Sequence, residues 1–120
     1  MRGEGKDLEG ERAAHRRRLE EAVARIREVL PGLPGVRRVS LFGSAARGRA
    51  DLLTDLDVLG VRDTEEPFVE RHPSLYRALA LPVDLDLICY TPEEFEAMRE
   101  RPFLRRILRE EVVLYEADAG

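Results

Sequence analysis

The chain has 120 residues, enough to bury one hydrophobic core, so we predict a single domain over residues 8–116 that follows a flexible terminus at residues 1–7. Its net charge is −4 at pH 7. This acidic balance argues against broad binding to duplex nucleic acid, which depends on many Lys and Arg contacts with phosphates.

The first half of the chain is predicted to form a helix, a strand and a second, short helix. Apolar residues recur at helical spacing over about residues 8–30, and a Pro- and Gly-rich segment ends the pattern. Alternating residues predict a strand over 36–42, which ends at Gly43. Ser44 is a good N-cap residue, so we expect it to begin a short helix over 44–49.

The second half of the chain alternates predicted strands with predicted helices. The strands cover residues 55–61, 83–90 and 112–115. A helical pattern over 68–81 contains Pro73, so we expect a short irregular helix that starts near this proline. Thr91 and Pro92 are typical of a helix start, and Pro102 divides the apolar pattern after them into two helices. These elements predict the α+β (α/β) class.

Acidic residues recur at alternate positions on two of the predicted strands. Asp55 and Asp57 lie two residues apart, so their side chains point to the same side of the strand. Asp84 and Asp86 share one side of the next strand, and either could supply a third carboxylate. Carboxylate oxygens suit Mg²⁺, and two such ions can orient a triphosphate and stabilise the leaving pyrophosphate.

A Gly-Ser pair follows the strand over 36–42. Gly43 allows the backbone to turn and to approach a ligand closely, and Ser44 offers a hydroxyl and nearby amide groups at a helix start. Arg47 can neutralise phosphate charge. We therefore predict that these three residues bind the phosphates of a nucleotide.

Residues 41–59, which read LFGSAARGRADLLTDLDVL, resemble the nucleotidyltransferase superfamily that includes DNA polymerase beta. The shared pattern is a Gly-Ser pair, a ten-residue spacer at 45–54 and an Asp-x-Asp. The Ala-Ala-Arg-Gly that follows Gly-Ser narrows the resemblance to prokaryotic minimal nucleotidyltransferases, although Thr54 stands where these commonly have serine. The resemblance implies a nucleotidyltransferase fold, with a small mixed sheet of about four strands and helices packed on one face.

The resemblance also implies roles for the acidic residues. Asp55, Asp57 and a third carboxylate would be catalytic and would bind the metal ions. In the family the third carboxylate lies on a strand shortly before a Thr-Pro-Glu helix start, and this favours Asp86 as metal ligand and base. Asp84 points to the same side of the strand and stays an alternative.

The function implied by the resemblance is an adenylyltransferase that uses two Mg²⁺ ions to move AMP from ATP to a hydroxyl group. In minimal family members the acceptor is often a HEPN-type toxin, for which the transferase is the antitoxin. One alternative is a non-catalytic antitoxin module that binds nucleotide or partner. Another is a transferase for small aminoglycoside-like molecules, which usually requires an added substrate domain.

The chain shows no substrate-recognition domain, so we expect a partner protein or a second copy of the chain to present the acceptor. Cys89 is the only cysteine and lies in an apolar run, which is typical of a buried thiol in a reducing compartment. No apolar stretch approaches the length of a membrane span. We therefore expect a cytoplasmic protein with no membrane association.

Overall fold

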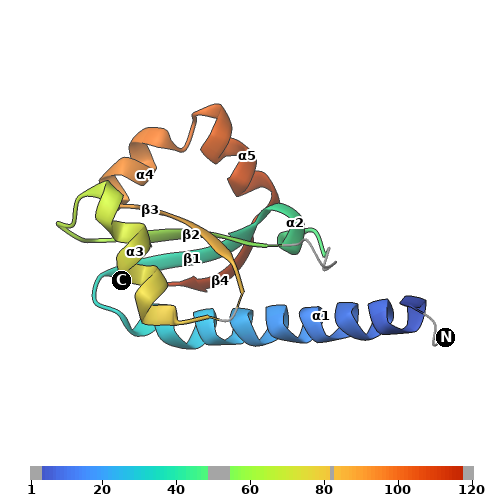
Figure 1. Ribbon diagram of the computed structural model, residues 1–120. Helices are drawn as coiled ribbons and strands as arrows, with labels where there is room; N and C mark the ends of the chain where they lie inside the picture. The colour runs from blue at the N-terminus through green and yellow to red at the C-terminus, as the bar shows by residue number, and fades with distance from the viewer. Residues whose placement is uncertain (1–3, 49–54, 82, 118–120) are drawn as a thin grey trace.

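The computed structural model describes residues 4–48, 55–81 and 83–117, and a mixed sheet of four strands lies at its centre (Figure 1). The strands are β1 (Val36–Phe42), β2 (Leu56–Arg62), β3 (Leu85–Tyr90) and β4 (Val112–Glu116). They lie in the order β3-β2-β1-β4, in which β2 and β3 are parallel and the other pairs are antiparallel. The predicted class and the sheet of about four strands are confirmed.

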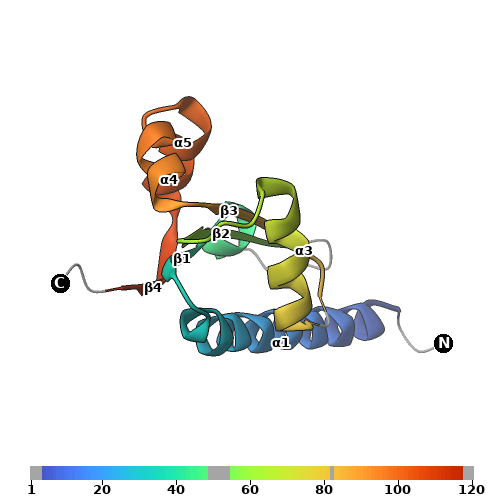
Figure 2. The same cartoon turned by 90° about the vertical axis from the view of Figure 1, so that its left-hand side faces the viewer.

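The sequence predicts helices on one face of the sheet, but the structure has helices on both faces. They are α1 (Glu4–Val29), the 3₁₀-helix η1 (Leu30–Gly32), α2 (Gly43–Ala46), α3 (Phe68–Leu79), α4 (Pro92–Met98) and α5 (Pro102–Glu110). Figure 2 shows α1 and α3 on one side of the sheet and α4 and α5 on the other.

The composition of β2 explains why both faces are covered. Leu56 and Val58 point to one face, where they join a core with α1 and α3. Leu59 and Val61 point to the other face, where they join a second core with α4 and α5. A strand with apolar side chains on both sides must be covered on both sides, so a single helical layer would expose one of these pairs to water.

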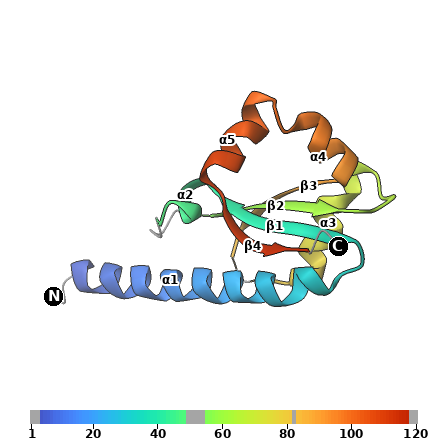
Figure 3. The same cartoon turned by 180° about the vertical axis from the view of Figure 1, so that it is seen from behind.

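Helix α1 is long, and within residues 9–29, whose burial is described, the side chains that join the core lie in its second half. It has 26 residues, or about 39 Å at 1.5 Å per residue, and its buried residues are Leu19, Ala22 and Ile26. Its N-terminal half extends past the sheet (Figures 1 and 3). The helix begins at Glu4, earlier than the apolar pattern predicts, while residues 1–3 lie outside the described part of the chain. None of the helices in the described ranges combines the length and apolarity needed to cross a membrane.

Helix α3 continues through Pro73, so the predicted helix start near this proline is wrong. Proline removes one backbone hydrogen bond from a helix interior and usually bends or ends the helix. Here Arg71, Leu75 and Leu79 are buried at four-residue spacing on both sides of the proline. The packing of this buried side stabilises the helix across the missing hydrogen bond.

A buried arginine connects α3 with the start of α4. Nη1 of Arg71 donates to the backbone oxygen of Cys89 at 3.1 Å and to Oε1 of Glu94 at 2.6 Å. Glu94 also accepts from the backbone N–H of Thr91, whose hydroxyl accepts from the Glu94 backbone, and this completes a capping box. The predicted helix start at Thr91 and Pro92 is confirmed. Cys89 is buried as predicted, and burial raises the pKa of its thiol to about 11.

We predict that Glu94→Gln lowers the free energy of unfolding by about 1 kcal/mol near neutral pH, because it removes a charged partner of Arg71. The hydrogen bond from Arg71 lowers the pKa of Glu94 below its ordinary value of 4.5. The stabilisation is therefore present above pH 4.5 and is lost as the pH falls through the lower pKa of the folded state. Urea unfolding of wild type and variant across this range measures the difference.

Glu93→Gln is the matched control, because Glu93 lies in the same first turn of α4 and is exposed. It should lower the free energy of unfolding by less than Glu94→Gln does. Equal losses for the two variants would show that the effect comes from the helix dipole and not from Arg71.

Candidate functional site

The parallel pairing of β2 with β3 brings together acidic residues that are distant in the sequence. Asp57 and Asp86 are direct partners across the two strands. Asp55 immediately precedes β2. Asp84 precedes β3, and its backbone oxygen accepts a hydrogen bond from the Leu56 N–H at 3.4 Å. Asp86, and not Asp84, is therefore the residue beside Asp57.

The charges of these residues act on one another. Burial raises the pKa of Asp57 above its ordinary value, and the negative charges of Asp86 and Asp55 raise it further. The positive charge of Arg47 acts in the opposite direction. Asp57 is half-buried, whereas Asp55 and Asp86 are exposed. A bound cation would relieve the repulsion among the three carboxylates.

The described residues contain no group of three acidic, His or Cys side chains already gathered around a common metal position. This arrangement still fits Mg²⁺. That ion is usually bound through one or two carboxylates, with the phosphate oxygens of the substrate and water completing its shell. Asp57 and its neighbour Asp86 offer oxygen donors of this kind at one end of the sheet.

Gly43 lies directly against Asp57 at the end of β1. Its φ angle is +72°, a conformation that strongly favours glycine. A Cβ atom at this position would overlap the Oδ2 atom of Asp57. The absence of a side chain at Gly43 therefore leaves room for the Asp57 carboxylate beside the turn into α2.

Ser44 does not cap α2, so this prediction is wrong. The helix begins at Gly43, one residue earlier than expected, because the chain turns there after the extended Phe42. Phe42 is the flanking residue, and no side-chain hydrogen bond caps the helix. The helix ends at Ala46, whereas residue 49 of the predicted helix lies outside the described residues.

A cavity of about 270 Å³ lies at this end of the sheet. It is lined by Phe42, Gly43, Ser44, Arg47, Asp57, Phe103, Arg106, Ile107 and Glu110. The structure thus brings the three predicted phosphate-binding residues together with Asp57 in one cavity, which we call the site pocket. Asp55 and Asp86 are not among its lining residues.

Four of the lining residues come from α5, which ends next to α2 (Figure 1). One of them, Glu110, forms an ion pair with Arg47, with Oε2 and Nη1 3.2 Å apart. The α5 sequence predicts only an amphipathic helix with a buried side at Leu104 and Ile107. No motif joins it to the Gly-Ser pair, so only the fold reveals this side of the pocket.

One of three similar solved structures supports the fold. A candidate nucleotidyltransferase from Sulfolobus solfataricus is 23% identical, with a TM-score of 0.55, over 100% of this chain and 96% of that chain. A toxin–antitoxin complex, MntA–HpeT, is 18% identical with a TM-score of 0.49, over 83% of this chain and 73% of that chain. A toxin–antitoxin structure with AMP-PNP is 18% identical with a TM-score of 0.47, over 86% and 74% of the two chains. Only the first of these similarities is strong enough to bear on the fold.

Sequence comparison identifies the family. No curated protein matches the chain. The family model described as Nucleotidyltransferase domain matches residues 19–118, which include the Gly-Ser pair, the Asp-x-Asp and both later carboxylate candidates. The chain therefore belongs to the nucleotidyltransferase domain family.

Proposed function

We propose that this nucleotidyltransferase transfers AMP from ATP to a hydroxyl group in a Mg²⁺-dependent reaction. The observation that carries the proposal is the position of Asp57. It lies against Gly43 in the site pocket and beside Asp86 on the neighbouring strand. The Asp57 carboxylate can thus bind metal ions at a position where these ions also contact a bound triphosphate.

Asp55, Asp57 and Asp86 are the residues proposed to hold two Mg²⁺ ions. When bound, the ions would neutralise phosphate charge and stabilise the leaving pyrophosphate. The carboxylates provide hard oxygen donors. Burial, and then repulsion from Asp86 and Asp55, raises the pKa of Asp57, and a bound cation would relieve this repulsion.

Gly43, Ser44 and Arg47 are proposed to bind the phosphates. The N–H groups of the first helical turn lack partners within the helix and point toward its N-terminus, where they favour anions. Ser44 adds a hydroxyl that does not cap α2. Arg47 adds positive charge at the end of the same short helix.

The proposed reaction is a displacement at the α-phosphorus. The acceptor oxygen forms a bond to this phosphorus, and the bond between the phosphorus and the oxygen bridging to the β-phosphate breaks. Pyrophosphate leaves with the bonding electron pair. Asp86 takes the proton of the acceptor hydroxyl as a general base.

We further propose that the acceptor hydroxyl belongs to a HEPN-type partner protein in the cytoplasm, for which this chain acts as antitoxin. Asp55 and Asp86 are exposed, so a hydroxyl carried on a large molecule can reach them. The resemblance of the Gly-Ser-Ala-Ala-Arg-Gly segment at residues 43–48 to minimal nucleotidyltransferases supports this class of acceptor.

Gly43→Ala should abolish nucleotidyl transfer, because its Cβ atom would displace the Asp57 carboxylate. Gly48→Ala is the matched control, since Gly48 has a similar φ of +84° but, apart from its chain neighbours, no described residue has an atom within 4 Å of an added Cβ. Both variants should lose about 1 kcal/mol of stability through backbone strain, yet only Gly43→Ala should lose activity. Unfolding curves and transfer assays on both variants measure this. Equal activities of the two variants would contradict the role of the Gly43–Asp57 contact.

Asp57→Asn should reduce transfer of labelled AMP to the partner by roughly 10³-fold, because it removes a proposed metal ligand. Its melting temperature should not fall, since the substitution also removes a charge that burial and two neighbouring carboxylates disfavour. If wild type and Asp57→Asn neutralise the partner equally well, the non-catalytic antitoxin alternative is correct.

Asp86→Asn should abolish transfer in the same assay, whereas Asp84→Asn should retain most of it. The reason is the strand register, which makes Asp86 the direct partner of Asp57. Both residues are exposed, so neither substitution is expected to unfold the protein. An active Asp86→Asn together with an inactive Asp84→Asn would reverse the assignment.

A further inference from the structure

Helix α5 has a different environment on each of three sides. Leu104 and Ile107 are buried and hold the helix against the sheet. Phe103, Arg106 and Glu110, at helical spacings of three and four residues, line the site pocket. Arg105 and Arg109, four residues apart, are exposed and do not line that pocket.

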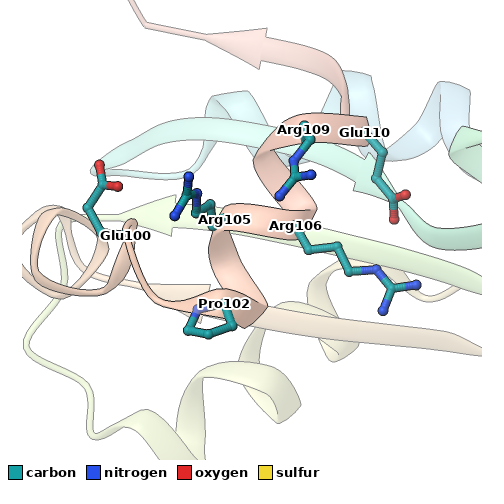
Figure 4. Close-up of a pocket in the computed structure, with 6 residues that line it drawn as sticks. All are labelled: Glu100, Pro102, Arg105, Arg106, Arg109 and Glu110. Carbon is teal, nitrogen blue, oxygen red and sulfur yellow. The ribbon is translucent and has the colours of Figure 1, made fainter.

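A second cavity, which we call the outer groove, runs along the exposed part of α5. It has a volume of about 550 Å³ and is lined by Glu100, Pro102, Arg105, Arg106, Arg109 and Glu110. Figure 4 shows that Arg106 and Glu110 extend to one side of the helix, while Arg105 and Arg109 extend to the other. Arg106 is the only one of these three arginines that also lines the site pocket.

The two arginines of the site pocket differ in their charge partners. Arg47 is paired with Glu110. In residues 4–48, 55–81 and 83–117, no carboxylate forms an ion pair with Arg106. A triphosphate carries several negative charges and would lie near the carboxylate of Asp57. The guanidinium of Arg106 can therefore bind phosphate without first breaking an ion pair, whereas Arg47 is already paired with Glu110.

Phe103 contributes an exposed aromatic ring to the same pocket. The residue is 54% exposed although it belongs to a helix with a well-packed buried side. The ring meets Phe42 edge-on, with 6.5 Å between the two centroids, so one face of Phe103 is not used by this contact. Stacking of a nucleobase on such an exposed ring is favourable and independent of base identity.

We propose that α5 forms the outer wall of the nucleotide site, where Arg106 binds the triphosphate and Phe103 stacks against the base. This inference rests on the proposed function and adds two binding residues to it. The ligand class is a nucleoside triphosphate.

The end of α5 is anchored, so these two side chains are presented from a fixed position. Glu111, the residue after α5, accepts hydrogen bonds from the Ser40 hydroxyl and from Arg38, both on β1. Ser40 is fully buried, and the Glu111 side chain is only 6% exposed. A wall held in this way loses little freedom when a ligand binds, which favours affinity.

The test is calorimetric titration of the full chain, in Mg²⁺, with two probes: a non-hydrolysable ATP analogue and inorganic tripolyphosphate. Arg106→Ala should weaken the binding of both probes by about 10-fold or more, because both carry the phosphates. Phe103→Ala should weaken the analogue by about 10-fold and leave tripolyphosphate unchanged, because only the analogue carries a base.

Arg105→Ala is the matched control, since it removes an identical exposed charge one residue away that lines the outer groove and not the site pocket. It should change the affinity for either probe by less than about 2-fold. If wild type binds the analogue but Arg106→Ala and Arg105→Ala behave alike, the inference is wrong and the proposed function stands. Wild type without affinity for either probe would overturn both.

Discussion

The register between β2 and β3 determines whether the acidic residues of this protein can act together. Pairing of Leu56 with Leu85 places Asp57 beside Asp86 and leaves Asp84 before the start of β3. A shift of one residue would turn the Asp86 side chain to the core on the opposite face of the sheet. The apolar residues that alternate with the carboxylates, Leu85 and Leu87, are buried and so fix this register. The same alternation that builds the core therefore positions the candidate site.

The site combines features that do not favour folding. Burial and two neighbouring negative charges disfavour the ionised form of Asp57, and Gly43 holds a φ angle that other residues adopt with strain. Such costs persist because the surrounding sheet has two well-packed cores. They also suit the proposed site, which would gain stability on binding a nucleotide and its cations.

Much of the fold follows from sequence patterns alone. Alternation predicts β1 over 36–42, and Thr91 with Pro92 predicts the start of α4, because both signals depend on local spacing and side-chain chemistry. Coverage of both sheet faces, by contrast, depends on which residues of β2 are buried. The sequence of β2 does not show which of its two faces the helices cover. The continuity of α3 through Pro73 depends on packing at Leu75 and Leu79.

In the candidate site, too, some features are predictable from local sequence and others depend on the packing of distant elements. The Gly-Ser pair and Asp-x-Asp are recognisable because they lie close together in the sequence at the spacing of a known pattern, and the family match includes both. The choice between Asp84 and Asp86 requires the register of two strands that are far apart in the sequence. Arg106 and Phe103 carry no signal at all, since an exposed arginine and an apolar residue are ordinary on an amphipathic helix. Their position beside the pocket arises only from the packing of α5 against the sheet.

The most direct test of the proposed nucleotide and metal site is a crystal structure with a non-hydrolysable ATP analogue and Mn²⁺, an ion whose anomalous scattering locates it. Mn²⁺ should lie between the phosphates and the carboxylates of Asp57 and Asp86, and the triphosphate should lie against Gly43 and Ser44. Nucleotide and metal bound elsewhere, for example in the outer groove beside Arg105 and Arg109, would contradict it.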